Sequence, residues 1–278
     1  MPDKELERLC EKWEKQYRYG TVEQRKERAK LWEPYYSSIY KKQLGCPYSH
    51  RDHKSGTVEQ LVSAGILNRE TTVLDIGCGL GAYSLEMSQY CKSVLALDSN
   101  RIAIDVLKDR CAQNKVNSIE ALSIAWEDYL PQRKFKFVFS SMCPAICNLQ
   151  ELLKMEVLCS GYCVLLTVMN GSYEKCRKKM MQELGIVPEG MITEYGVYLS
   201  VLEQLGREVS AYKESFQSGR ILTADDLIEQ YVPYLRIFGI EDDRARSYLM
   251  DFFERNQEDG KLYDESKINT ALLYWKAE

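Results

Sequence analysis

Short apolar runs alternate with amphipathic segments over most of the chain. Apolar runs of strand length cover residues 73–76, 93–98, 119–124, 136–141, 161–168, 208–216 and 268–275. Segments with apolar residues at helical spacing lie between or before them, at 57–64, 82–90, 100–113, 173–184, 195–205 and 223–238. Strands that alternate with helices in this way build a parallel sheet with helices on its faces, so the pattern predicts an α/β fold.

The first 54 residues follow a different pattern, with helical spacing and no strand. Leu6, Leu9, Trp13 and Tyr17 share one apolar face, and a second face at 31–40 is rich in aromatic residues. We expect two or three helices here. The spacing leaves three arrangements open: packing on the sheet, contact with a second copy of the chain in a homodimer, or a lid over a binding site.

Composition limits the classes of partner. The 278 residues include 37 Lys and Arg against 41 Asp and Glu, and a net charge of −4 offers no field for a polyanion, so we expect no nucleic-acid partner. The apolar runs are far shorter than the roughly 20 residues of a membrane helix, so no membrane is expected. Residues 1–16 are charged throughout, unlike a signal peptide. Ten cysteines without a Cys-x-x-Cys pair favour reduced thiols in the cytoplasm.

The most specific signal is a glycine-rich turn after the first strand. Asp75, Gly77, Gly79 and Gly81 stand at alternate positions, and the next apolar run ends on Asp98. Glycine lets the backbone turn sharply and come close to a ligand, and the helix that follows presents unpaired N–H groups. An acid about twenty residues further on, at the tip of the next strand, is placed to accept hydrogen bonds from both hydroxyls of a ribose. We therefore expect a nucleotide-cofactor site here.

Asp75 distinguishes between the cofactors that such a turn can bind. The spacing Gly77-x-Gly79-x-x-Ala82 also fits a dinucleotide fingerprint. A carboxylate two residues before the first glycine repels a pyrophosphate, whereas it attracts a ligand with a cationic amino-acid tail. S-adenosylmethionine has such a tail, a ribose and no phosphate.

At this point the sequence resembles the class I S-adenosylmethionine-dependent methyltransferases. Their first motif is acid-x-Gly-x-Gly-x-Gly, and their second is an acid that closes the second strand. The four residues of the turn match the first motif and Asp98 the second, in order and spacing. The resemblance covers residues 55–168. It implies a Rossmann-like doubly wound seven-stranded sheet, mostly parallel with an antiparallel last strand, plus N-terminal helices. It also implies S-adenosyl-L-methionine as cofactor and in-line transfer of its methyl group.

Three small side chains border the expected cofactor site: Cys78 in the turn, Ser99 beside Asp98, and Ser141 at the end of the fourth strand. Ligands of open α/β sheets bind at the carboxyl ends of strands, so the loop 142–146 is expected to border the methyl donor. This loop lacks the Asn/Asp-Pro-Pro-aromatic tetrapeptide that family members acting on amide or ring-amino nitrogen tend to carry. The departure disfavours a nucleic-acid base or a glutamine amide as acceptor.

The segment after the third strand is where the resembled family usually places an acid for the adenine amino group. Ala125 or Trp126 holds the aligned position here, and Glu127 and Asp128 follow. The resemblance therefore leaves two arrangements open. Backbone groups and the indole face hold the adenine, or Glu127 or Asp128 accepts its amino group.

Both histidines of the protein lie in a loop rich in glycine, proline and serine, residues 45–56. His50, His53 and Cys46 are open to three interpretations: metal ligands, ordinary surface residues, or acceptor contacts that include a general base. A clear fourth ligand is missing, so we expect no metal. His50 and His53 lead the candidates for the catalytic base. Three tyrosines come next, Tyr36, Tyr40 and Tyr48.

These features predict an S-adenosylmethionine-dependent methyltransferase that acts on an unidentified small-molecule acceptor. We divide the chain into an N-terminal helical lid and loop, residues 1–54, and a methyltransferase domain, residues 55–278, with a helical insert at about 172–206. A non-catalytic S-adenosylmethionine-binding sensor or subunit shares these residues and stays an alternative. An NAD-dependent oxidoreductase shares the glycine turn, but no Tyr-x-x-x-Lys pair stands in the segment directly after the fifth strand.

Overall fold

The computed structural model describes residues 4–17, 21–42, 44, 56–186 and 192–278. Its strands are β1 (Thr72–Ile76), β2 (Ser93–Asp98), β3 (Ile119–Ser123), β4 (Phe135–Ser141), β5 (Cys159–Val168), β6 (Tyr173–Glu174), β7 (Ser210–Leu222) and β8 (Leu262–Lys276). Its helices are α1 (Lys4–Tyr17), α2 (Val22–Lys41), α3 (Gly56–Ser63), α4 (Ala82–Met87), α5 (Arg101–Gln113), α6 (Leu149–Val157), α7 (Lys175–Glu183), α8 (Tyr195–Gln204), α9 (Ala224–Arg236) and α10 (Asp242–Asn256), with one 3-10 turn, η1 (Trp126–Asp128). None of the helices in these ranges is long and apolar enough to cross a membrane.

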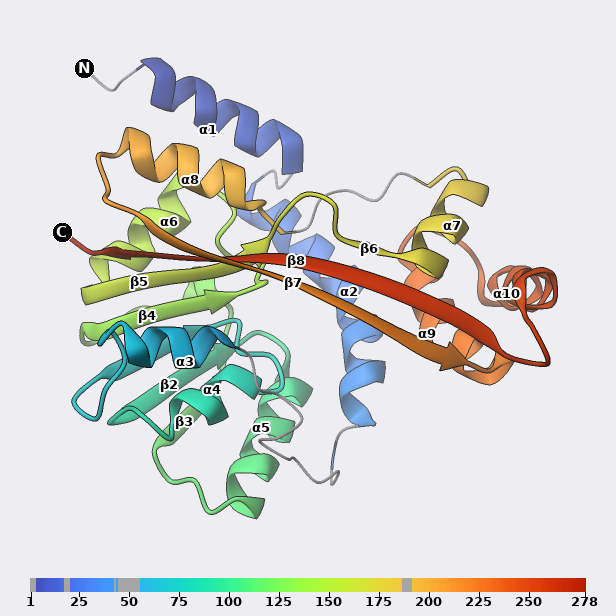
Figure 1. Ribbon diagram of the computed structural model, residues 1–278, viewed down its shortest axis with the longest axis horizontal. Coiled ribbons are helices and arrows are strands. Elements are labelled where there is room, and N and C mark those ends of the chain that lie inside the picture. The colour runs from blue at the N-terminus through green and yellow to red at the C-terminus, as the bar shows by residue number, and fades with distance from the viewer. Residues whose placement is uncertain (1–3, 18–20, 43, 45–55, 187–191) are drawn as a thin grey trace.

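All strands belong to one sheet, in the order β3-β2-β1-β4-β5-β8-β6, with β7 on the other edge of β8 (Figure 1). Strands β1 to β5 are parallel, and β8 runs antiparallel to both β5 and β7. The predicted fold class is thereby confirmed. Over the described ranges the sheet has eight strands where seven were predicted. The additional strand is the two-residue β6, which forms because β8 extends past β5 and offers Lys267 and Ser266 as partners.

Helices cover both faces of the parallel part of the sheet (Figure 1). Because successive strand residues point to opposite faces, Leu74 and Ile76 join one core and Val73 joins the other. The first core contains side chains of α1, α6 and α8, among them the fully buried Trp13. The second contains side chains of α3, α4 and α5. Both cores therefore support the edge at which the parallel strands end.

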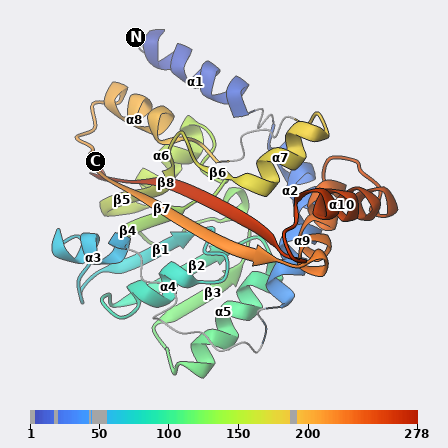
Figure 2. The ribbon, with the colours of Figure 1, turned by 45° about the vertical axis from the view of Figure 1, so that its right-hand side comes forward.

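The β7–β8 hairpin extends beyond the sheet and carries a separate helical lobe (Figures 1 and 2). Helices α7, α9 and α10 enclose a third core there, with Leu227, Tyr231, Leu249 and Phe252 buried. The predicted strands 208–216 and 268–275 cover only part of this hairpin. The segment 217–221 is exposed and lacks an alternating apolar pattern, so the sequence gives no signal for its extension. Helix α10 was not predicted either.

Helix α2 lies between the carboxyl edge of the sheet and this lobe (Figure 2). A capping box starts it, in which the Thr21 hydroxyl accepts from the Gln24 N–H and the Gln24 side chain accepts from the Thr21 N–H. On its lobe side, the Trp32 ring packs against Tyr234 and Phe238 of the lobe, with ring centroids 5.9 and 6.5 Å away. The helix thus connects the end of the parallel sheet with the lobe.

Candidate functional site

The glycine turn after β1 has the backbone geometry that its sequence predicts. Gly77, Gly79 and Gly81 all have positive φ, at 71°, 53° and 78°. A Cβ on Gly77 would lie 2.2 Å from the Cys143 Sγ, so any side chain would displace the loop after β4. A Cβ on Gly79 would meet only the Tyr40 hydroxyl among the described residues, in ordinary van der Waals contact at 3.9 Å. Gly79 is therefore the less crowded of these two glycines.

Asp98, at the end of β2, is bound to the same turn. Its two carboxylate oxygens accept hydrogen bonds from the N–H groups of Gly79, at 2.9 Å, and Asn100, at 2.8 Å. Burial raises the pKa of Asp98, and the two N–H groups act in the opposite direction. Each oxygen of a carboxylate has a second lone pair, so Asp98 retains acceptor capacity for two hydroxyl groups. Its neighbour Ser99 is exposed.

Asp75 lies beneath the turn and is only 2% exposed. The Ser84 hydroxyl, on α4, donates to its Oδ2 at 2.5 Å. Burial raises the pKa of Asp75 to about 7, the Ser84 hydrogen bond lowers it, and the charge of Asp98 raises it. A cation placed near Asp75 would favour its ionised form.

The loop after β4 closes the other side of the turn. Ser141 ends the strand, and Met142 follows with a φ of 49°, a conformation that residues other than glycine rarely adopt. The Met142 N–H donates to the Leu166 carbonyl on β5 at 2.9 Å, which holds this conformation in place. Burial raises the pKa of the Cys143 thiol to about 12, so the group beside Gly77 is a neutral thiol and not a nucleophilic thiolate.

The η1 turn holds the residues predicted to meet the adenine. Trp126 is 3% exposed, the Lys154 ammonium lies 4.3 Å from the centre of its ring, and Tyr129 stacks beside it. The Lys154 ammonium also donates to the Trp126 carbonyl at 2.5 Å. Because the indole is already covered, Glu127 and Asp128 are better placed than Trp126 to receive an adenine amino group. Ala125 precedes the turn as its N-cap residue.

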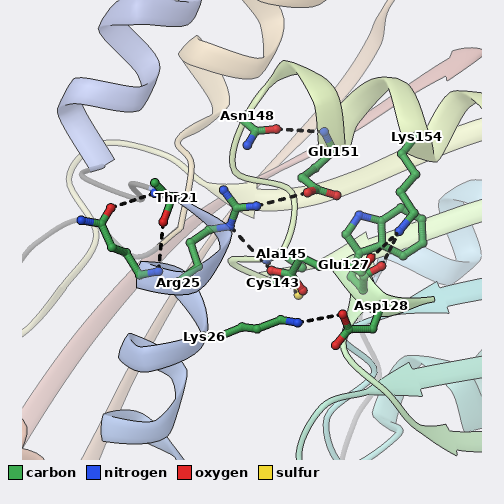
Figure 3. A network of polar contacts seen from close by, with 12 residues as sticks. Thr21, Arg25, Lys26, Glu127, Asp128, Cys143, Ala145, Asn148, Glu151 and Lys154 are labelled. Atoms are coloured by element: carbon green, nitrogen blue, oxygen red, sulfur yellow. Dashed lines mark hydrogen bonds and ion pairs between the residues drawn. The ribbon is translucent and has the colours of Figure 1, made fainter. Parts of the chain in front are cut away.

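A buried arginine of α2 joins η1 to α6, as Figure 3 shows. The Arg25 side chain is 11% exposed and lies between two carboxylates, 3.3 Å from Glu151 and 3.6 Å from Glu127. Next to it, the Lys26 ammonium donates to Asp128 at 2.8 Å on the surface. Asn148 caps α6 by accepting from the Glu151 N–H. The start of α2 is therefore fastened to the segment that is expected to hold the adenine.

No local pattern in the sequence singles out Arg25. More than a hundred residues separate it from Glu127 and Glu151, and a basic pair on a helix is typical of a solvated face. Only the arrangement of α2 along the edge of the sheet brings these charges together.

Tyr36 and Tyr40 of α2 reach the glycine turn. Their rings stack with centroids 5.9 Å apart, and the Tyr40 hydroxyl lies over Gly79. Ser37, between them, accepts a hydrogen bond from the Asn100 side chain at 3.1 Å. Burial raises the pKa of both tyrosines, so both are neutral hydroxyl groups at ordinary pH.

The other candidates for the catalytic base lie outside the described residues. These are His50, His53 and Tyr48, and Cys46 of the suggested metal set lies there too. In the described part of the chain, no group of three or more His, Cys, Asp or Glu side chains is arranged to hold a metal ion. The nine cysteines in that part have free thiols.

Comparison with known families and relatives agrees with this geometry. Residues 73–156 match a family model described as a methyltransferase domain. A probable cobalt-precorrin-6B C(15)-methyltransferase (decarboxylating) of Methanocaldococcus jannaschii is 33% identical over 73 residues, which are 26% of this chain and 40% of that protein. A probable ribosomal RNA small subunit methyltransferase A of Methanosphaera stadtmanae is 36% identical over 62 residues, 22% of each chain. The chain thus matches less than half the length of these relatives.

Solved structures share the fold over most of the chain. The YcgJ protein of Bacillus subtilis has a TM-score of 0.51 at 13% identity, with 80% of this chain and 98% of that chain covered. Coclaurine N-methyltransferase, solved with N-methylheliamine and SAH, also has a TM-score of 0.51, at 12% identity, with 99% of this chain and 94% of that chain covered. At such identities the likeness shows the fold alone.

Proposed function

Since this chain carries a class I, S-adenosylmethionine-dependent methyltransferase domain, we propose that it transfers a methyl group to a small-molecule acceptor held between the glycine turn and α2. The observation that carries the proposal is the hydrogen-bonded pair of Gly79 and Asp98, which lies beneath the Tyr40 hydroxyl of α2. The bound cofactor would supply an already activated methyl group. The protein's own task is then to align the acceptor and to exclude water.

The residues around the turn fit S-adenosylmethionine. Asp98 would accept both ribose hydroxyls, and the backbone of Gly79, which carries no side chain, would contact the cofactor directly. Asp75 would attract the cationic amino-acid end, directly or through water. Glu127 would accept the adenine amino group, held in place by Arg25. We further propose that Cys78, Gly81, Ser99 and Ser141 border this site.

A small acceptor is supported by what covers the site. Helix α2 and the lobe lie over the carboxyl edge of the sheet, and Tyr36 and Tyr40 close the space above the turn. The relatives named above include a methyltransferase for ribosomal RNA as well as one for a precorrin. The net charge of −4 favours the small molecule over the nucleic acid.

The described thiol and hydroxyl groups beside Gly77 and Gly79 are not poised as bases near neutral pH, and Asp75, whose pKa is raised to about 7, is buried beneath the turn. Cys143, Tyr36 and Tyr40 all have raised pKa values, so they offer hydrogen bonds and not proton uptake. We therefore keep His50 and His53 as the candidate bases. An acceptor that already carries a lone pair, such as a neutral amine, would need no base.

The direct test uses S-adenosylmethionine with an isotopic label in the methyl group and an extract divided into small molecules and RNA. Label should appear in the small-molecule fraction and not in the RNA. Label in the RNA fraction alone would replace the small acceptor with a nucleic acid. Cofactor binding without transfer to either fraction would favour the non-catalytic sensor or subunit.

We expect the affinity for S-adenosylmethionine to fall as the pH drops below about 7. Without cofactor, the raised pKa of Asp75, about 7, leaves its carboxylate ionised above this pH and protonated below it. The cofactor's ammonium is attracted only by the ionised form, so binding at lower pH must release a proton. The dissociation constant should then rise by about tenfold per pH unit. Calorimetric titrations at several pH values below and above 7 measure this dependence. The Asp75→Asn variant should bind S-adenosylmethionine with a dissociation constant that no longer varies with pH. A dissociation constant of the wild type that does not vary with pH would mean that Asp75 takes no part in cofactor binding.

The lid proposal makes a separate prediction about exchange of backbone hydrogens. Residues 31–56 should exchange more slowly when S-adenosylhomocysteine is bound, because the second half of α2 and the loop after it would close over the cofactor. Residues 21–28 serve as the internal control, since Arg25 already fastens that end of α2. Identical exchange of residues 31–56 with and without the ligand would leave these residues as passive packing or an oligomer contact.

A further inference from the structure

Strand β7 forms a long edge of the sheet that lacks the usual protection. Within the described ranges, β3, β6 and β7 each pair with a strand on one side only (Figure 1). Strand β3 has five residues and β6 has two, whereas β7 has thirteen. Proteins keep such edges short or interrupt them with proline, lysine or a bulge, because an open edge is a template for another strand. Strand β7 has no proline, a single lysine and an uninterrupted register with β8.

The hydrogen bonds of β8 show which backbone groups of β7 point away from the sheet. The Asn269 carbonyl of β8 accepts from the Met169 N–H after β5, and the Ala277 N–H after β8 donates to the Gly161 carbonyl of β5. Odd-numbered residues of β8 are therefore directed toward β5. Backbone groups alternate in direction along an antiparallel strand, so even-numbered residues of β8 bind even-numbered residues of β7. The odd-numbered residues of β7 point outward: Ala211, Lys213, Ser215, Gln217, Gly219 and Ile221.

The outward side of β7 is exposed and unpaired. The outward N–H and C=O groups form no hydrogen bond with any described residue. Every residue from 215 to 221 is exposed. Phe216 and Ile268, which lie opposite each other on the hairpin, are 45% and 41% exposed. An added strand would satisfy the backbone groups and cover part of this apolar pair.

The sequence of β7 is complementary to itself in one antiparallel register. With Gln217 opposite its own copy, Glu214 of each chain would lie opposite Arg220 of the other. Lys213, the third charged residue of the strand, would lie opposite Ile221, so no like charges meet. Neither neighbouring register that keeps the outward groups paired aligns the glutamate with the arginine. This charge pattern therefore favours a second copy of the chain over an unrelated strand.

Both charged side chains keep polar atoms for such a contact. The Arg220 side chain is 45% exposed, and its Nε and Nη2 donate to Asp264, which leaves Nη1. The Glu214 Oε1 accepts from the Tyr212 hydroxyl at 3.0 Å and lies against Gly56, which leaves Oε2. The hydrogen bonds within each chain thus hold the two groups in place for the opposite strand.

We propose that β7 pairs with β7 of a second copy of the chain, antiparallel and about a two-fold axis at Gln217, so that the two sheets become one. The symmetry makes each contact occur twice, the pair of Glu214 and Arg220 included. The two Phe216 rings would be diagonal neighbours across the axis. The homodimer contact would then lie on the hairpin and not on the N-terminal helices. The inference does not depend on the proposed methyltransferase function.

Sedimentation velocity of the full chain from about 1 to 100 µM measures the association. The wild type should form dimers within this range. Gln217→Pro takes one outward N–H from each chain at the axis, and an edge strand tolerates proline where the N–H faces outward. It should raise the dissociation constant of the dimer by at least about tenfold. Gln217→Thr is the matched control, because it changes the same side chain but keeps the N–H and should dimerise like the wild type.

Cross-linking tests the register. In Gln217→Cys the two cysteines would be directly opposite, with Cα atoms about 5.5 Å apart, so a short bis-maleimide should join the chains. Ile221→Cys is the control on the same side of the strand, at a position that is 57% exposed. Its two copies would be offset by about 26 Å along the strands and should not be joined. The wild type gives the background from the native cysteines.

Circular dichroism shows whether each variant is folded, and the cross-linking pair decides if Gln217→Pro is not. A wild type that stays monomeric over the whole range contradicts the proposal. A folded Gln217→Pro variant that dimerises like the wild type contradicts it too, as does cross-linking of Ile221→Cys as fast as that of Gln217→Cys. A dimer that binds no S-adenosylmethionine would contradict the proposed function and support this inference.

Discussion

Replacing Asp98 with alanine should weaken S-adenosylmethionine binding by about 2–4 kcal/mol, on the order of 30- to 1,000-fold in the dissociation constant. The carboxylate would lose two charge-assisted hydrogen bonds to the ribose, and their losses overlap. It would also lose its hydrogen bonds to the N–H groups of Gly79 and Asn100, which support the turn. Isothermal titration of the variant and the wild type gives the difference directly.

Asp105→Ala is the matched control for this experiment. It removes a carboxylate from α5, where Asp105 pairs with Arg101 at 3.8 Å on the surface, so cofactor affinity should stay unchanged. Circular dichroism should show that the fold survives in both variants. A folded Asp98→Ala variant with the wild-type dissociation constant would mean that the ribose binds elsewhere.

Arg25→Met should lower the free energy of unfolding by about 3–5 kcal/mol. The arginine is 11% exposed between Glu127 and Glu151, which are 17% and 8% exposed, so its loss leaves two carboxylates without their shared cation in a poorly solvated place. Urea denaturation measures the change. Lys26→Met is the control next to it, because the exposed pair with Asp128 should contribute only about 0–1 kcal/mol.

A double variant separates lost charge from lost packing. Adding Glu151→Gln to Arg25→Met removes one of the two carboxylates left behind and should recover part of the stability. If Arg25→Met costs no more than Lys26→Met, the buried ion pairs do not fasten α2 to η1. The positioning of Glu127 by Arg25 would then have no support.

The parallel core of the sheet was the part of the fold that the sequence predicted best. Strands at 72–76 and 93–98 agree with the expected 73–76 and 93–98, and the helix at 101–113 with the expected 100–113. A strand buried on both faces is apolar along its whole length, so its bounds can be read directly from the sequence.

The lobe could not be predicted in the same way. The outer half of the β7–β8 hairpin is largely exposed, and hydrogen bonding between the two strands sets its length instead of an apolar pattern. The packing of Tyr35 on Tyr234 depends on a contact between α2 and α9, almost two hundred residues apart, so no local pattern could show it.

In the candidate site, too, local features could be predicted from the sequence, and contacts between distant segments could not. The backbone conformation of the glycine turn and its link to Asp98 follow from local sequence, because both lie within one βαβ unit. The covered indole of Trp126 and the ion pairs of Arg25 depend on α6 and α2, which come from distant parts of the chain. The roles of His50 and His53 remain predictions, since both lie outside the described residues.

The most direct test of the central claim is a calorimetric titration of the purified protein with S-adenosylmethionine, S-adenosylhomocysteine and NAD. We expect both adenosyl ligands to bind with dissociation constants in the micromolar range, about −8 kcal/mol, and NAD to give no heat of binding, because Asp75 would lie close to its pyrophosphate. Tight binding of NAD without heat from either adenosyl ligand would contradict the account.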